Sequence, residues 1–181
     1  GLALHQHSTL KKVFPSNGGW DGKQTIVSAG GSPVTIYTID FSLAPPGNKF
    51  YFGVGDKMLS PKDQAGSWAF SILPFVDQEI IFDDRNWQFG MALYNCRARR
   101  HFAAKPSVPN DTLGVYESAG WLWGRTDYAI NMVAFGMDYQ EVYKAAHFAD
   151  GMSNTIMIGE KAYDVTQQAN NWYYDEGYFT G

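Results

Sequence analysis

Asp150 and Glu160 are the residues whose type first suggests chemistry. Two carboxyl groups that face one cleft can act as general acid and general base, as in glycoside hydrolysis. The motifs that usually mark a catalytic site are missing, since the chain has no Gly-x-Ser-x-Gly elbow, phosphate loop, His-Glu-x-x-His or Cys-x-x-Cys pattern. A hydrolase is therefore the weakest of three hypotheses, and we expect a protein without enzymatic activity and without a cofactor.

The histidines and acidic residues do not predict a metal site. His5 and His7 are two positions apart, so their side chains point in different directions on a helix. Asp83, Asp84 and Asn86 are rich in oxygen atoms but lack the spacing and the central glycine of a calcium loop. We expect a solvated helix end there.

The most structured polar motif is a turn-like segment that leads into a predicted strand and closes with a glutamate; its members are Asp150, Gly151, Ser153, Asn154 and Glu160. The Asp150 carboxylate can accept hydrogen bonds from backbone N–H groups two or three residues further on, and Gly151 permits a tight turn. Ser153 and Asn154 can satisfy further backbone groups. We expect a structural turn that fixes how the strand enters its sheet.

A candidate binding patch combines arginines and tryptophans: Arg97, Arg99, Arg100, Trp121, Trp123 and Trp172. Arginines bind carboxylates and phosphates, and aromatic rings can form a platform for sugars or peptides. A solvated basic loop and tryptophans packed in the core or at its rim are the more common outcomes. The patch supports the second hypothesis, an extracellular module that binds a glycan or a peptide.

Composition favours one folded domain over residues 1–181, rich in loops and containing strands. Of the 181 residues, 16% are aromatic and only 18% are charged, with 19 Gly and 8 Pro. The net charge of −4 gives no electrostatic reason to expect a nucleic-acid partner. Cys96 is the single cysteine, which is typical of a small buried side chain, or of a missing disulfide partner in an exported protein.

The first 15 residues predict a helix whose beginning is missing. Ala3, His7, Leu10 and Phe14 fall on one helix face, and Pro15 ends the pattern. No Ser, Thr, Asp or Asn precedes this run to cap it. The pattern allows two interpretations: an ordinary short N-terminal helix docked on the core, or, over residues 1–15, the stub of a longer N-terminal helix.

The rest of the chain predicts short strands and helices around an apolar centre. We expect a helical region with a break near Pro74, and a loop-rich elaboration over residues 60–125. The remaining predicted elements are strands at 25–27, 34–41, 49–54, 126–135 and 155–158, and a helix at 137–146.

Five segments resemble, in order, the conserved blocks of a large bacterial family with prepilin-like N-termini, expanded in planctomycetes and known as domain of unknown function fifteen fifty-nine. They are Gly1-Leu2-Ala3-Leu4-His5 with Phe14-Pro15, Ser67-Trp68 through Leu73-Pro74-Phe75 to Gln78, Tyr94-Asn95-Cys96, Thr126-Asp127-Tyr128-Ala129, and Asp150-Gly151-Met152-Ser153-Asn154-Thr155-Ile156 with Gly159-Glu160. The resemblance covers about a third of the chain. The family's Pro-Ser-Asp after the cysteine is replaced by Arg97-Ala98-Arg99, and its closing His and Asp-Gly segment is missing.

The resemblance implies an α+β, pilin-like fold, with the N-terminal helix packed on an antiparallel sheet and a loop-rich insertion. It implies an exported, pseudopilin-like structural subunit of a type II secretion-like or surface assembly, which is our first hypothesis. Its expected partners are other pilin-like subunits or envelope proteins, and the membrane through an N-terminal helix ahead of Gly1. Family members often carry a cysteine just before the first block, so Cys96 is expected to pair with it. The family has no established catalytic residues.

Overall fold

A computed structural model describes most of the chain, and the fold is mixed helix and strand. The described residues are 1–19, 21–23, 25–27, 33–35, 37–39, 49–51, 53–86, 89–99, 105–106, 122–136, 138–162 and 178. Short helices alternate with small antiparallel sheets, which confirms the predicted α+β class. In this part of the chain, no helix is long and apolar enough to cross a membrane.

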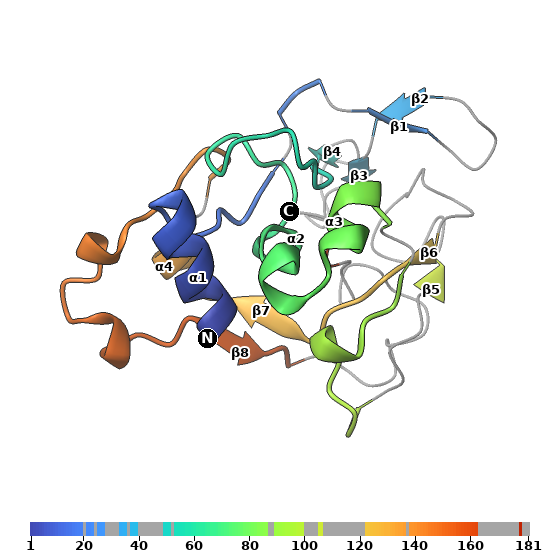
Figure 1. Cartoon of the computed structure of the whole chain (residues 1–181). Helices are drawn as coiled ribbons and strands as arrows, with labels where there is room; N and C mark the ends of the chain where they lie inside the picture. Colours follow the sequence, from blue (N-terminus) through green and yellow to red (C-terminus); the bar gives the residue numbers. More distant parts are fainter. Residues whose placement is uncertain are drawn as a thin grey trace.

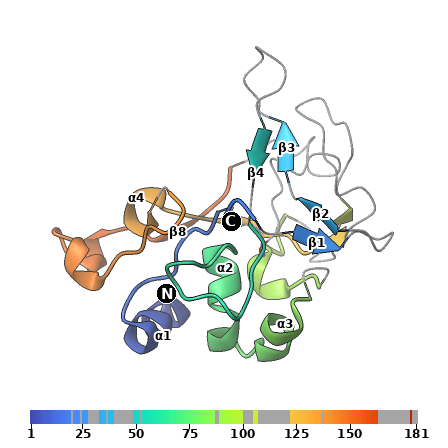
Figure 2. The same ribbon diagram turned by 90° about the horizontal axis from the view of Figure 1, so that it is seen from above.

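The helices are short apart from the first. The helical elements are α1 (Leu2–Lys11), α2 (Trp68–Ser71), η1 (Leu73–Val76), α3 (Glu79–Asp84), η2 (Ala92–Tyr94), α4 (Met132–Phe135), η3 (Ala145–His147) and η4 (Met152–Asn154), where η marks a 3-10 helix. Figures 1 and 2 show α1, α2 and α3 grouped on one side of the molecule, with strands β3 and β4 lying away from α1 in both views.

The strands form four separate two-stranded antiparallel sheets within the described residues. They pair as β1 (Thr25–Val27) with β2 (Pro33–Thr35), β3 (Tyr37–Ile39) with β4 (Lys49–Tyr51), β5 (Lys105–Pro106) with β6 (Leu122–Trp123), and β7 (Tyr128–Ile130) with β8 (Ile158–Glu160). The single strand predicted at 34–41 is thus wrong in one respect. It is divided into β2 and β3, which pair with different partners.

Helix α1 confirms the predicted N-terminal helix but buries a different face. Leu4 and His7 are buried, whereas Leu10 is 67% exposed. Each step of three residues turns a helix by about 300°, so a stripe from Leu4 through His7 has rotated about 120° away from the core by Leu10. Phe14 is fully buried, but it lies beyond the helix, because Lys12 adopts a left-handed conformation (φ 68°) and reverses the chain.

The apolar centre between residues 66 and 84 confirms the predicted helical region with its break. The Ser67 side chain caps α2 by accepting a hydrogen bond from the Phe70 N–H at 3.3 Å. Pro74 lies in the first turn of η1, where its missing N–H costs no helical hydrogen bond. Asp77 then ends η1 in a left-handed conformation (φ 59°), so the region is three short helices in place of two.

Two predictions between residues 126 and 146 are wrong. The strand ends at Ile130, because Asn131 caps α4 by accepting from the Val133 N–H at 3.1 Å. The predicted helix at 137–146 is absent from its described part, apart from the start of η3. Gln140 has a left-handed conformation (φ 71°), and the Tyr143 hydroxyl donates to the Glu141 carboxylate at 2.5 Å, so local turns replace the helix.

The core lies under the three helices and is aromatic. Trp68 and Tyr94 meet edge to face at 6.1 Å between ring centroids, and Tyr94 meets Tyr178 at 5.2 Å. Gly124 makes room for Tyr178, since a Cβ there would lie 2.3 Å from the tyrosine ring. The Ser67 hydroxyl donates to the Tyr178 carbonyl at 2.5 Å. Burial raises the pKa of both tyrosines.

Candidate functional site

Asp127 is the residue at which three segments of the chain meet. Its side chain is fully buried, and its Oδ2 accepts a hydrogen bond from the Cys96 N–H at 2.6 Å. Its own N–H donates to the Tyr94 carbonyl at 2.7 Å, and its carbonyl accepts from the Lys161 N–H at 2.7 Å. A buried carboxylate requires such donors, because it has lost its water. Asp127 therefore joins η2, β7 and the end of β8.

Arg99 binds the end of β8 at the same junction. Its guanidinium lies 3.3 Å from the Glu160 carboxylate and also donates to the Lys161 carbonyl. The two charged side chains are 28% and 49% exposed, so the pair is only partly screened from water. Arg99 and Glu160 thus both take part in structural contacts, and neither is held ready for a ligand.

The rest of the predicted binding patch is only partly described. Arg97 is exposed. Trp123 forms the backbone ladder of β6 opposite Lys105. The other three members, Arg100, Trp121 and Trp172, lie outside the described residues. The glycan- or peptide-binding hypothesis therefore stays a prediction.

The turn over residues 150–155 forms, but not through Asp150. The Asn154 Nδ2 donates to the Asp150 carbonyl at 2.7 Å, and the Thr155 hydroxyl donates to the Gly151 carbonyl at 3.2 Å. The predicted capping by the Asp150 carboxylate is wrong. That carboxylate and the Ser153 hydroxyl make no hydrogen bond among the described residues.

The reason lies in the backbone of the turn. Gly151 adopts φ +85°, and its N–H donates to the Phe148 carbonyl at 2.9 Å, while the Asn154 N–H donates to the Gly151 carbonyl at 3.0 Å. The turn is thus closed by bonds between backbone groups on both sides of Gly151, and the Asp150 carboxylate is left in solvent.

Asn131 connects this turn to the sheet. Its Nδ2 donates to the Ile156 carbonyl at 2.9 Å, and its N–H donates to the Met157 carbonyl at 2.9 Å. The segment between the turn and β8 is therefore held against the start of α4. This contact performs the role predicted for the motif, which is to fix how the strand enters its sheet.

The structure gives no support to the hydrolase hypothesis. Asp150 and Glu160 are both exposed, and neither lines the groove described below. Among the described residues, no group of three or more His, Cys, Asp or Glu side chains is placed to hold a metal ion. Asp83 instead pairs with Lys57 at 3.1 Å across the surface.

Cys96 is half-buried beside the Asp127 junction and is not in a disulfide. Its N–H is committed to Asp127, whereas its pairing with a cysteine ahead of Gly1 stays a prediction.

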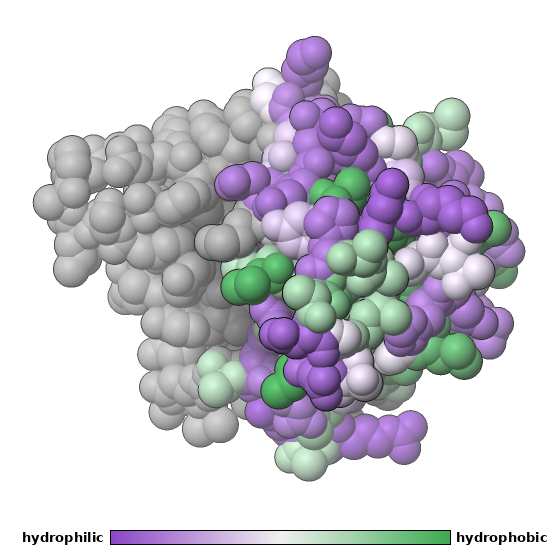
Figure 3. Space-filling view, turned by 90° about the vertical axis from the view of Figure 1, so that its left-hand side faces the viewer, coloured by the Kyte–Doolittle hydropathy of each residue, from purple (hydrophilic) through white to green (hydrophobic). Residues whose placement is uncertain are grey.

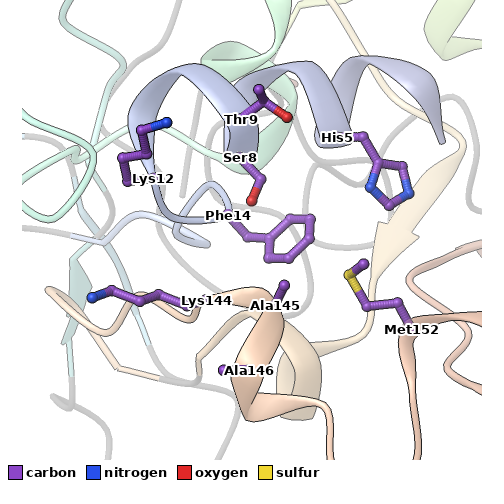
Figure 4. Close-up of a pocket in the computed structure, with 9 residues that line it drawn as sticks. All are labelled: His5, Ser8, Thr9, Lys12, Phe14, Lys144, Ala145, Ala146 and Met152. Atoms are coloured by element: carbon purple, nitrogen blue, oxygen red, sulfur yellow. The ribbon is translucent and has the colours of Figure 1, made fainter.

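An open groove lies between α1 and the segment around η3, with a volume of about 390 Å³. Figure 4 shows two lysines, Lys12 and Lys144, at one end of it, the Phe14 ring at its centre, and His5 and Met152 toward the other end. The face of the molecule seen in Figure 3 carries apolar surface bordered by hydrophilic residues.

Phe14 connects the end of α1 to the segment around η3, beneath this groove. Its N–H donates to the Tyr143 carbonyl at 2.8 Å, and its ring packs edge to face on Phe135 at 5.8 Å and Phe148 at 5.5 Å. On the inner side of α1, the His7 Nδ1–H donates to the Val13 carbonyl at 3.0 Å. Burial lowers the pKa of His7 to about 4, so its imidazole is neutral at pH 7.

The five segments that resemble family blocks form one unbroken path of contacts. His7, between the two parts of the first, meets Phe75 of the second at 5.7 Å, and Trp68 of the second meets Tyr94 of the third. Tyr94 then binds Asp127 of the fourth, and Tyr128 of the fourth pairs with Glu160 of the fifth in the β7–β8 sheet. The five segments thus contact one another in the folded domain, and their role there is structural.

The family model described as protein of unknown function (DUF1559) matches residues 1–178. The chain belongs to this family. No curated protein and no solved structure matches it. The match extends the likeness from the five blocks to almost the whole chain of this DUF1559 protein.

Sequence reasoning missed the groove and the buried role of Asp127. Lys12 and Lys144 are far apart in the chain, and no periodicity links a helix end to a 3-10 turn. For Asp127, the only signal was its place inside the fourth block, which says nothing of its partners. Both features depend on tertiary contacts.

Proposed function

We propose that this DUF1559 protein is a non-enzymatic, pseudopilin-like subunit of a cell-envelope secretion system or surface assembly. In this proposal the protein is exported and anchored in the membrane through a helix that continues into α1. Its folded domain lies in the periplasm or at the cell surface and contacts other pilin-like subunits. We also propose that the fold is pilin-like.

The observation that carries the proposal is the firm attachment of α1 to the domain. Leu4 is 1% exposed and His7 is 3% exposed, while Phe14 directly after the helix is fully buried. Helix α1 also packs against η1, in the apolar centre of the fold. A helix fixed in this way can transmit force and orientation between a membrane and a domain, which an assembly subunit requires.

The outer side of α1 supports the same role. Leu2 is 74% exposed and Leu10 is 67% exposed, although both are large apolar side chains in a helix. Apolar side chains that gather into a larger exposed patch mark contacts with other proteins, and a second helix laid along α1 would join these two leucines into one patch. In a pilin-like assembly, neighbouring helices would cover these two leucines.

The test uses the protein expressed from its whole gene, with a C-terminal epitope tag, in a bacterial host. We expect it in the membrane fraction, released only by detergent, and present as cross-linked oligomers after treatment of intact cells. Leu10→Glu is expected to leave membrane association intact but to remove the oligomers. A tagged protein that is fully soluble without detergent and stays monomeric would contradict the proposal.

Cys96 provides a second test of export. In the whole gene product we expect a disulfide between Cys96 and a cysteine upstream of Gly1, detected by peptide mapping without reductant. A Cys96 thiol that reacts completely with an alkylating agent before reduction would show that this disulfide does not form.

A further inference from the structure

The groove between α1 and η3 has walls that are fixed before any ligand arrives. The Phe14 N–H bonds to the Tyr143 carbonyl at 2.8 Å and so ties the end of α1 to the segment that leads into η3. The Phe14 ring packs on Phe148 below the groove. A preformed site loses less entropy on binding than a surface that must be ordered first.

The two ends of the groove differ in chemistry. At one end, Lys12 comes from α1 and Lys144 from the opposite wall, as Figure 4 shows. The backbone of Lys12 is fixed by its left-handed conformation and by the hydrogen bond from its N–H to the Ser8 carbonyl at 2.9 Å. Toward the other end, Met152 provides an apolar wall beside the Phe14 ring.

The charge at the lysine end is not balanced by the protein. Neither lysine ammonium group has a hydrogen bond or ion pair among the described residues, and no Asp or Glu lines the groove. The Ser8 and Thr9 hydroxyls also line it, and in the described part of the chain they make no side-chain hydrogen bond. Two cations and two hydroxyl donors are therefore among the residues that line one groove, in a chain whose net charge is −4.

From this arrangement we infer that the groove binds a small organic anion with an apolar body. Its carboxylate or phosphate lies between Lys12 and Lys144 and accepts from the Ser8 and Thr9 hydroxyls. Its apolar body packs against Met152 and the methyl groups of Ala145 and Ala146, above the buried Phe14 ring. The volume of about 390 Å³ falls within the range of roughly 300–1,000 Å³ found for small-molecule sites. This inference is independent of the assembly role proposed above.

The test is a calorimetric titration of residues 1–181 with four probes. They are 4-phenylbutyrate, phenyl phosphate, the neutral 4-phenylbutyramide and acetate. We expect the two aromatic anions to bind, and the amide and acetate to bind at least about tenfold more weakly. The amide lacks the negative charge, and acetate lacks the apolar body. The aromatic anion that binds tighter distinguishes a carboxylate ligand from a phosphate ligand.

Matched variants locate the site. Lys12→Gln and Lys144→Gln should each weaken the binding of the aromatic anion by about tenfold. Lys11→Gln removes the same charge from the adjacent exposed position, which does not line the groove, and should leave the affinity unchanged. Equal binding of acetate, equal loss with Lys11→Gln, or no binding of either aromatic anion would overturn the inference. Melting curves of the variants confirm that these surface changes leave the fold intact.

Discussion

Helix α1 and the turn over residues 150–155 attach to the domain by opposite means. The helix is held by buried side chains, with Leu4 and His7 against the core and no side-chain cap at its N-terminus. The turn is held by hydrogen bonds, and its Ser153 and Asn154 side chains are exposed. The stability of the first region therefore depends mainly on side-chain packing. The stability of the second depends mainly on hydrogen bonds to backbone groups.

This difference predicts unequal sensitivity to mutation. A buried apolar contact loses transfer energy and leaves a cavity when it is truncated, whereas an exposed hydrogen bond is replaced by water at small cost. Both regions carry segments that resemble family blocks, yet we expect them to contribute unequally to stability. The variants below test the contrast, from the largest expected effect to the smallest.

Leu4→Ala and Leu10→Ala are the same substitution in the same helix. Leu4 is 1% exposed and Leu10 is 67% exposed. We expect Leu4→Ala to lower the free energy of unfolding by about 3 kcal/mol, and Leu10→Ala to change it by less than about 0.5 kcal/mol. Urea denaturation followed by tryptophan fluorescence measures both. The reverse order would mean that the helix face read from the sequence, which includes Leu10, is the buried one.

His7 makes the α1 contact sensitive to acid. Its pKa is about 4 in the folded chain and 6.5 in the unfolded chain, so the unfolded chain binds the extra proton first. The stability that neutral His7 confers is complete above pH 6.5 and is lost as the pH falls toward 4. The difference of about two and a half pH units corresponds to roughly 3 kcal/mol.

The measurement is the free energy of unfolding between pH 7 and pH 4 for wild type, His7→Gln and His147→Gln. We expect His7→Gln to flatten the profile over this interval, while His147→Gln, at an exposed position, follows wild type. If wild type and His7→Gln keep parallel profiles, the imidazole does not govern the acid sensitivity.

Asn154→Ala and Asp150→Ala separate the two accounts of the turn. The Asn154 side chain bonds to the Asp150 carbonyl, and the Asp150 carboxylate bonds to nothing in the described structure. We expect Asn154→Ala to cost about 1 kcal/mol and Asp150→Ala almost nothing. Chemical denaturation at pH 7 compares them. A larger loss for Asp150→Ala would restore the capping role predicted from its type.

The sequence was sufficient where a local pattern and the tertiary fold agree. Helix α1, the break near Pro74 and the strands β3 and β4 all follow from periodicity, turn residues and strand-forming residue types. It failed where one contact overrides local preference. The cap from Asn131 ends β7, and Gln140 in a left-handed conformation excludes the predicted helix.

The candidate sites show the same limit. The type of a residue identified Asp150 and Glu160 as notable, but type alone does not reveal which donors surround a carboxylate. Asp127, with no motif of its own beyond a family block, is the carboxylate that accepts a backbone N–H, from Cys96 in a distant segment. Likewise, the groove depends on a hydrogen bond between Phe14 and Tyr143, which are far apart in the chain.

The Arg99–Glu160 pair, which holds β8 beyond the turn, is also expected to have only small effects. Glu160→Gln removes only a partly exposed ion pair, so we expect a change below about 0.5 kcal/mol that vanishes in about 0.5 M salt. Arg99→Gln also removes the hydrogen bond to the Lys161 carbonyl, so its cost should be about 1 kcal/mol and should persist in salt. Urea midpoints at two salt concentrations measure both variants. Equal, salt-sensitive losses would mean that charge, and not the backbone bond, holds Arg99 at the end of the strand.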